Sequence, residues 1–371
     1  MNNAHIISIG SLASFSRGLT YSRSDEVDYS SNVVLRSNNI DLATNTLNFD
    51  ELKYISDAIN IPEDKKLQRN SIFMCMSNGS KQHLGKVAFI DRDYPYAFGG
   101  FMGLIKPKED IIIPKLLYYY FCSSKFKGFL SSIGNGANIN NIKFVDIAKD
   151  YISVPEKTTQ QSIIEELDKI NELIRLKKEQ LKDYDNLAQS IFYEMFGDPV
   201  VNEKGWEVKK FADLYKLKSG DSLSAKNFVE GEIPVYGGNG ISGYHNDFNM
   251  DGDFIIIGRV GVYCGNVREV HGKFWLTDNA FQLFYNREIQ YPCFIHYLLE
   301  ILDLHKYANA AAQPVISNLT LKDVEIIIPP LPLQQLFAQR IELIERQKAE
   351  IQNTISDLET LLASRMQYWF D

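Results

Sequence analysis

The amino-acid sequence predicts an α+β protein built from two similar modules, each a strand-rich domain followed by one long helix. A 45-residue segment, 152–196, recurs without a gap as 326–370. Both copies carry a heptad pattern of apolar residues, and short strand-like motifs repeat in the same order before each copy. Two similar modules at a fixed separation are suited to binding an extended, repetitive partner, and duplex DNA is the obvious example.

The repeat sets the expected domain boundaries. They are a first globular domain over 1–155, a first helical spacer over 156–199, a second globular domain over 200–329 and a second helical spacer over 330–371. The apolar fraction of 45% and the charged fraction of 23% are those of an ordinary soluble protein. We expect a cytoplasmic protein with free thiols, because no signal peptide, CxxC pair or membrane-length apolar run is present.

The first globular domain is expected to consist of short strands, one or two helices and long polar loops. Strand-like segments occur at 34–40, 70–80 and 84–90. Pro114 opens a short helix, PKLLYYYFCSSKF, because proline suits a first helical turn. A Gly-rich loop over 134–144 then leads into a strand over Tyr151–Val154.

The first long helix, 158–196, and its repeat, 332–370, carry a heptad seam sustained over more than four repeats. The seam residues are Ile163, Leu167, Ile170, Ile174, Leu181, Tyr184 and Ile191, and then Phe337, Ile341, Ile344, Ile351, Ile355, Leu358 and Leu362. This spacing favours a coiled coil. An ordinary amphipathic helix is the alternative, and it would show a period nearer 3.6 and a wider apolar stripe.

The second globular domain echoes the first. SRG at 16–18 matches KSG at 218–220, 34–40 matches 235–241, and 70–80 matches 253–263. Pro292 opens the helix PCFIHYLLEILDL, and an Ala-rich loop over 308–318 leads into a strand over Glu325–Ile328. The framework therefore repeats while the loops differ, as expected when one scaffold is used for two different targets.

Two equal helices in one chain most simply pair with each other. An antiparallel coiled coil would place the two globular domains at opposite ends, related by a pseudo-twofold axis. The lone polar seam positions, Lys177 and Lys348, are candidates for fixing the register, although a lysine there can equally extend toward solvent.

Candidate DNA contacts lie in the polar loops of both globular domains. Arginine and asparagine match the edges of guanine and adenine, whereas lysine more often neutralises phosphates. The candidates are Arg17, Arg36, Asn38, Lys81, His83 and Lys86 in the first domain, and Lys218, Tyr236, Asn239, Tyr244, His245 and Arg259 in the second. For each of these residues a purely structural role remains open, and the turn 237–240 can be simply a turn.

No catalytic or metal site is predicted. The six histidines form no ligand pair, and GxSxG and both Gly-rich nucleotide motifs are absent from suitable positions. The net charge of −8 argues against a simple basic DNA-coating protein. A DNA-binding surface must then consist of local basic patches or be completed by a partner.

The repeat framework resembles the specificity (S) subunit of type I restriction–modification systems. The helix openings VPEKTTQQSIIEELDKI and PPLPLQQLFAQRIELIE carry the resemblance, together with PVYGGNGISGYH, FIIIGRVGVYCGNV and TDNAFQL in the second domain. It extends over essentially the whole chain.

This resemblance implies a subunit without catalytic activity. Each target recognition domain would read one half of a bipartite, asymmetric sequence in double-stranded DNA, and the helices would fix the spacer. Two methyltransferase (M) subunits would methylate adenine with S-adenosylmethionine, and restriction (R) subunits would use ATP and magnesium, so this chain itself would hold no cofactor. A membrane role is not implied.

Two alternatives from other classes remain at this stage. One is a self-contained enzyme with its active site in the strand-rich domains. The other is a coiled-coil protein-interaction adaptor without sequence-specific DNA binding.

Overall fold

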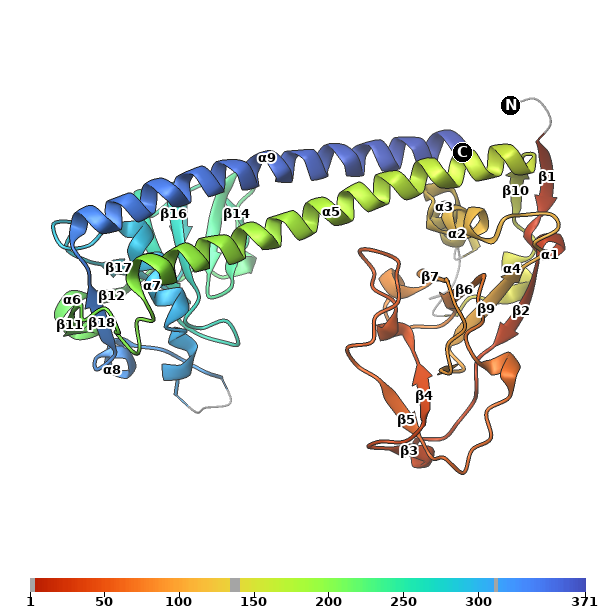
Figure 1. Cartoon of the computed structure of the whole chain (residues 1–371), viewed down its shortest axis with the longest axis horizontal. Helices are drawn as coiled ribbons and strands as arrows, with labels where there is room; N and C mark the ends of the chain where they lie inside the picture. The colour runs from red at the N-terminus through yellow and green to blue at the C-terminus, as the bar shows by residue number, and fades with distance from the viewer. Residues whose placement is uncertain (1–3, 134–140, 310–312) are drawn as a thin grey trace. The chain divides into compact units, whose positions relative to one another are not determined.

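The computed structural model describes residues 4–133, 141–309 and 313–371, and the Lys81 side chain is outside the described part. The chain forms two compact units, Met1–Lys177 with Thr354–Asp371, and Lys178–Asn353. Helices α5 (Lys157–Phe196) and α9 (Leu331–Phe370) each contribute to both units (Figure 1). The two helices begin one residue before their predicted starts. The predicted α+β class with two long helices is confirmed, and the proposed domain boundaries stay predictions.

The described residues of the first unit form three small sheets. Strand β1 (His5–Ser8) pairs antiparallel with β10 (Tyr151–Val154). A four-stranded sheet has the order β2-β9-β6-β7, and a second has the order β3-β5-β4-β8. These strands are β2 (Ala13–Arg17), β3 (Glu26–Val27), β4 (Asn32–Leu35), β5 (Lys53–Ile55), β6 (Ser71–Cys75), β7 (Val87–Ile90), β8 (Ala97–Phe98) and β9 (Met102–Pro107).

The helix predicted from Pro114 is divided in two, α2 (Pro114–Cys122) and α3 (Ser124–Ile133). Ser123 explains the break. Its hydroxyl donates to the Tyr120 carbonyl at 2.6 Å and accepts from the Phe126 N–H at 3.3 Å, so it caps the second helix. Short helices α1 (Ile9–Leu12) and α4 (Phe144–Ile147) complete this unit. The predicted Gly-rich loop 134–144 lies mostly outside the described residues.

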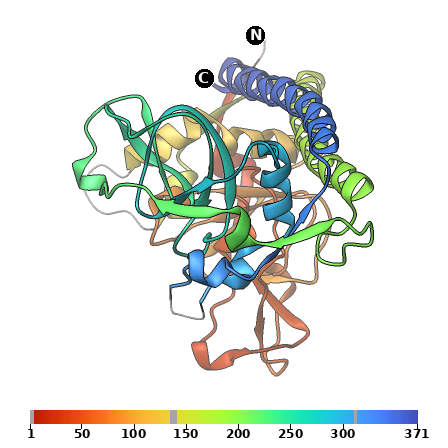
Figure 2. The same cartoon turned by 90° about the vertical axis from the view of Figure 1, so that its left-hand side faces the viewer.

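The second unit, which faces the viewer in Figure 2, contains a six-stranded sheet and a strand pair. The sheet has the order β12-β17-β15-β16-β13-β14, and the pair is β11-β18. Its strands are β11 (Glu207–Lys210), β12 (Lys216–Ser219), β13 (Ile233–Gly237), β14 (Gly240–His245), β15 (Met250–Gly258), β16 (Val267–Leu276), β17 (Ala280–Phe284) and β18 (Glu325–Ile328). Helix α7 (Pro292–Ile301) packs on β16, and α6 (Phe211–Leu214) and α8 (Asn318–Leu321) are short. Residues 310–312 of the predicted Ala-rich loop are outside the described part.

The same topology occurs in both units. The order β2-β9-β6-β7 corresponds to β12-β17-β15-β16, and the parallel pair β4–β8 corresponds to β13–β16. Strand β16 extends over Val267–Leu276 and takes part in both pairings. In the first unit two shorter strands make these pairings, because β7 pairs with β6 and β8 pairs with β4. One sheet in the second unit therefore corresponds to two sheets in the first.

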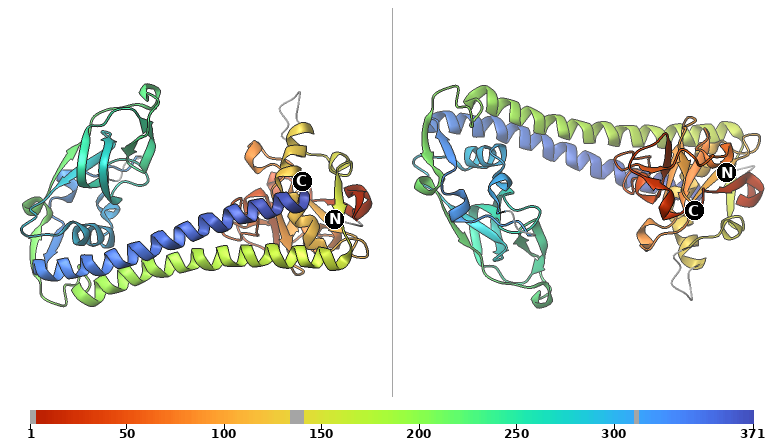
Figure 3. Two further views of the ribbon diagram at one scale, coloured as in Figure 1. Left: turned by 90° about the horizontal axis from the view of Figure 1, so that it is seen from above. Right: turned by 90° about the horizontal axis from the view of Figure 1, so that it is seen from below.

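Within each unit the long helices pack against each other in antiparallel fashion, as the views in Figure 3 also show. In the first unit Ile163 and Leu167 near the start of α5 share a core with Phe370 at the end of α9. In the second unit the centres of the Phe192 and Phe337 rings lie 5.7 Å apart. Every predicted seam residue is buried or half-buried. No helix in the described part combines the length and apolarity needed to span a bilayer.

A buried glutamine joins each long helix to the loop before α2 or α7. Gln160 accepts from the Ile113 N–H at 2.8 Å and donates to the carbonyls of Ile111 and Pro155. Gln334 makes the same three bonds, accepting from the Tyr291 N–H at 2.8 Å and donating to the carbonyls of Ile289 and Pro329. Both side chains are almost fully buried. The repeated Gln-Gln pair thus marks a structural joint between helix and domain.

Candidate nucleic-acid interface

In the first unit several strand ends meet at one turn, 99–102. The Met102 N–H closes the turn on the Gly99 carbonyl at 2.8 Å, and the Gly99 N–H donates to the Leu35 carbonyl at the end of β4. The Met76 N–H, just after β6, donates to the Phe101 carbonyl at 2.9 Å. This network uses backbone groups only, so its geometry does not depend on which side chains surround it.

The second unit repeats this network around the turn 277–280. The Ala280 N–H closes the turn on the Thr277 carbonyl at 3.1 Å, and the Thr277 N–H donates to the Tyr236 carbonyl on β13. The Arg259 N–H, just after β15, donates to the Asn279 carbonyl at 2.8 Å. Phe101 therefore corresponds to Asn279, and Met76 corresponds to Arg259.

The repeated glycines of SRG and KSG are explained by this packing. A Cβ on Gly18 would lie 2.1 Å from the Gly99 carbonyl oxygen, and a Cβ on Gly220 would lie 2.1 Å from the Leu276 carbonyl oxygen. Only glycine lets the ends of β2 and β12 approach the turn so closely.

Two of the predicted arginines lie at this turn, one in each unit. The Arg17 Nε donates to the Gly100 carbonyl at 3.1 Å, and the Arg259 guanidinium donates to the Asp278 carbonyl at 3.1 Å. The Arg259 guanidinium also donates to the Ser219 hydroxyl, next to exposed Lys218. The structure thus brings Arg259 to the end of β12, where it contacts the residue after Lys218 although the two are far apart in sequence.

The hairpin β13–β14 presents the other candidates of the second unit. Asn239 is exposed in its turn, and its carbonyl accepts from Arg268 at 3.4 Å. Tyr244 is 55% exposed. Tyr236 is half-buried and packs edge-on against Phe274. His245 is buried, and its Nδ1 accepts from the Val229 N–H at 3.0 Å, which counts against a direct contact of this ring with bases.

The first-unit candidates are more dispersed. Asn38 is exposed and donates to the Glu51 carboxylate at 3.2 Å. Arg36 and His83 are half-buried, and Arg36 Nε and His83 Nδ1 are buried without a hydrogen-bond partner among the residues the structure describes. The Lys81 backbone begins the 3-10 turn Lys81–His83.

Lys86 needs a correction, because its side chain does not reach solvent as a phosphate contact must. It is only 7% exposed, and its Nζ donates to the Ile40 carbonyl at 2.9 Å. Burial lowers the pKa of this ammonium, although Cys75 and Asp41 partly oppose that shift. From its residue type Lys86 was expected at the surface, whereas its ammonium donates to a loop carbonyl inside the unit.

Several surface residues next to this site were missed by sequence reasoning. Phe101 is 72% exposed, and its counterpart Asn279 is also exposed. Arg268 contacts the β13–β14 turn, and the Lys273 ammonium lies 4.5 Å from the centre of the Phe248 ring. The segments GGFM (99–102) and TDNA (277–280) occupy corresponding positions in the two repeats, and this correspondence could have identified Phe101 and Asn279 from the sequence.

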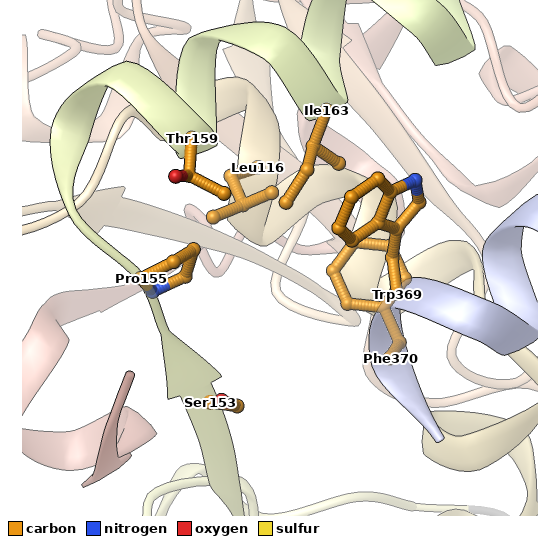
Figure 4. Close-up of a pocket in the computed structure, with 7 residues that line it drawn as sticks. All are labelled: Leu116, Ser153, Pro155, Thr159, Ile163, Trp369 and Phe370. Carbon is orange, nitrogen blue, oxygen red and sulfur yellow. The ribbon is translucent and has the colours of Figure 1, made fainter. Parts of the chain in front are cut away.

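The four cysteines are free thiols that are buried or half-buried. Burial raises the pKa of the Cys75, Cys264 and Cys293 thiols, and raises that of Cys122 to about 12. No group of three or more potential metal ligands occurs in the described ranges. A small pocket in the first unit has no ionisable lining residue (Figure 4); it is lined by Leu116, Ser153, Pro155, Thr159, Ile163, Trp369 and Phe370.

Comparison with known families places the chain in context. The model of the type I restriction modification DNA specificity domain matches residues 1–183 and again 203–360. The EcoprrI specificity subunit from Escherichia coli is 26% identical over 262 residues, which is 67% of this chain and 64% of that protein. The EcoKI specificity subunit from E. coli strain K12 is 29% identical over 44% of this chain and 35% of its own length. The alignments thus span between one third and two thirds of these relatives.

Solved structures show the same fold over nearly the whole chain. The type I restriction–modification S subunit from M. genitalium has 16% identity and a TM-score of 0.58, covering 100% of this chain and 96% of that one. A chain from a study of complex assembly and conformational transition of the type I R-M system has 15% identity and a TM-score of 0.59, covering 99% and 97%. At these identities the likeness establishes the fold.

Proposed function

The chain belongs to the family of type I restriction modification DNA specificity domains, and on that basis we propose that it is a non-catalytic DNA-recognition subunit. It reads a bipartite, asymmetric sequence in double-stranded DNA, with one half read by each unit. It belongs to a cytoplasmic type I restriction–modification complex that methylates adenine or cleaves DNA.

The observation that carries this proposal is the duplicated backbone framework around 99–102 and 277–280. The two frameworks have the same pattern of backbone hydrogen bonds. The residues at their surface differ, as Phe101 and Asn279 do. A common scaffold with different exposed side chains supports two readers of different targets.

The catalytic parts of the complex reside in other subunits. Two methyltransferase subunits bind this chain and use S-adenosylmethionine, and restriction subunits use ATP and magnesium. Because the net charge of this chain is −8, these partners also supply part of the positive surface that encloses DNA.

Methylation assays with and without the methyltransferase subunits test the proposal. The purified chain should transfer no methyl group, and adding the methyltransferase subunits should give methylation at one bipartite sequence. Methylation by the chain alone would instead indicate a self-contained enzyme.

A duplex-binding series over salt concentration separates the remaining alternative. With the methyltransferase subunits present, a preference for one sequence should persist as salt rises, because base contacts depend less on salt than phosphate contacts. Absence of any preference at every salt concentration would favour a protein-interaction adaptor.

A further inference from the structure

We propose that Arg17 and Arg259 have equivalent roles in the two units, and that each binds a phosphate of the DNA backbone as an anchor. This proposal rests on the function above. Each holds its unit on the DNA backbone whatever bases that unit reads. This assigns the two arginines a role different from base recognition, which their side-chain type alone would suggest.

The first support is the shared acceptor. Gly100 and Asp278 are the second residues of the two equivalent turns, and each carbonyl accepts from a guanidinium at 3.1 Å. The turns themselves are fixed by matching backbone bonds, so the two guanidinium groups bind equivalent carbonyls. Their other contacts differ, because Arg17 also bonds Asn141, whereas Arg259 bonds Ser219 and lies over the Phe281 ring.

The second support is that the two arginines come from different strands. Arg17 ends β2, where the second unit has Ser219 at the end of β12. Arg259 follows β15, where the first unit has Met76. The positive charge thus stays at one place in the framework although its position in the chain differs. A place that keeps its charge in two units with different loops is suited to a ligand common to both half-sites, and the phosphate backbone is that ligand.

The third support is charge and order. Arg17 is exposed and Arg259 is half-exposed, and the described residues give neither guanidinium a carboxylate partner within salt-bridge distance. The carbonyl bond fixes each side chain and leaves other N–H groups to bind phosphate oxygens. The adjoining third turn position, Phe101 or Asn279, differs between the units and is the better place for base-specific contact.

The test uses the complex of the full chain with its methyltransferase subunits. Variants Arg17→Ala and Arg259→Ala are compared with Arg92→Ala and Arg287→Ala as matched controls. Arg92 and Arg287 are exposed arginines over the rings of Tyr94 and Tyr285, in the same two units but away from the turns. Affinity is measured for cognate and non-cognate duplexes over salt concentration, and methylated sites are sequenced.

Arg17→Ala and Arg259→Ala should each lower the affinity for the cognate and the non-cognate duplex by the same factor. The sequence that is methylated should stay unchanged. The slope of log affinity against log salt should become shallower by about 0.9 for each lost phosphate contact. The control variants should keep the original slope. Arg17→Lys and Arg259→Lys keep the charge, so they should keep the slope and the sequence even if an alanine variant folds poorly.

Relaxed base choice in one half-site, or an unchanged slope in folded alanine variants, would overturn the inference while leaving the proposed function intact. Loss of sequence preference in the unmodified complex would instead overturn the proposed function, and this inference with it.

Discussion

At the scale of single residues, the Gln-Gln repeat shows how two identical neighbours take different roles. Gln160 is 1% exposed and makes three hydrogen bonds to backbone groups. Gln161 is exposed, and its side chain donates to the nearby Glu165 carboxylate at 3.0 Å. The sequence identified the pair as repeated, but burial decides which member holds the joint between helix and domain.

We expect Gln160→Ala to lower the free energy of unfolding of the first unit by on the order of 3 kcal/mol, because buried backbone groups lose their partners. Gln161→Ala is the matched control and should change it by less than about 0.5 kcal/mol. Denaturant unfolding of both variants measures the difference. Equal effects of the two substitutions would contradict the assigned role of Gln160.

A histidine in the second unit predicts a dependence of stability on pH. Burial lowers the pKa of His296, but hydrogen bonds with Glu269 and Glu300 outweigh it and raise this pKa to about 9. Because the folded-state pKa lies above the unfolded value of about 6.5, the protonated ring stabilises the fold. This contribution is complete below about pH 6.5 and is lost as pH rises through about 9.

We therefore compare the thermal unfolding midpoints of the wild type and of His296→Gln. The advantage of the wild type should decrease as pH rises from 6.5 to 9. His271→Gln is the control, because His271 pairs with Asp253 at an exposed position. A difference that stays constant over this pH range would contradict a raised pKa of His296 in the folded state.

At the scale of elements, the ends of the long helices are part of the domain cores. Phe337 on α9 is fully buried, and its ring contacts those of Phe192, Phe196 and Tyr297 at 5.3–5.7 Å. Leu343, six residues later on the same helix, is 62% exposed. The heptad seam therefore serves both helix pairing and attachment to the domain.

Phe337→Ala should cost about 3–5 kcal/mol of unfolding free energy in the second unit, since it leaves a cavity among packed aromatic rings. Leu343→Ala should cost less than about 0.5 kcal/mol. Chemical denaturation of the two variants gives the comparison. A small effect of Phe337→Ala would mean that this end of α9 is not a core element.

The sequence predicted the elements better than their contacts. Hydrophobic period and the proline signals indicated α5, α9, α2 and α7, because these depend on local residue order. The break at Ser123 was missed, because an apolar pattern continues through it. The burial of Lys86 and His245 was also missed, because it depends on residues distant in sequence.

At the scale of the whole molecule, the two helices are proposed to set the distance between half-sites. One heptad inserted into both, between 177 and 178 and between 353 and 354, adds about 10 Å to a helix pair. That equals about three base pairs of duplex at ~3.4 Å each. We expect both half-sites to be kept and the spacer between them to lengthen, as read by sequencing of methylated sites. Insertion into one helix only, which disrupts the pairing, is the control and should abolish methylation.

The central claim is that one chain carries two readers for two halves of one DNA sequence. Sequencing of every methylated adenine in cells that carry this chain with its methyltransferase subunits tests it most directly. The account predicts one asymmetric sequence in two specified parts, separated by a spacer of constant length and unspecified bases. A single contiguous sequence, or methylation without sequence preference, would contradict it.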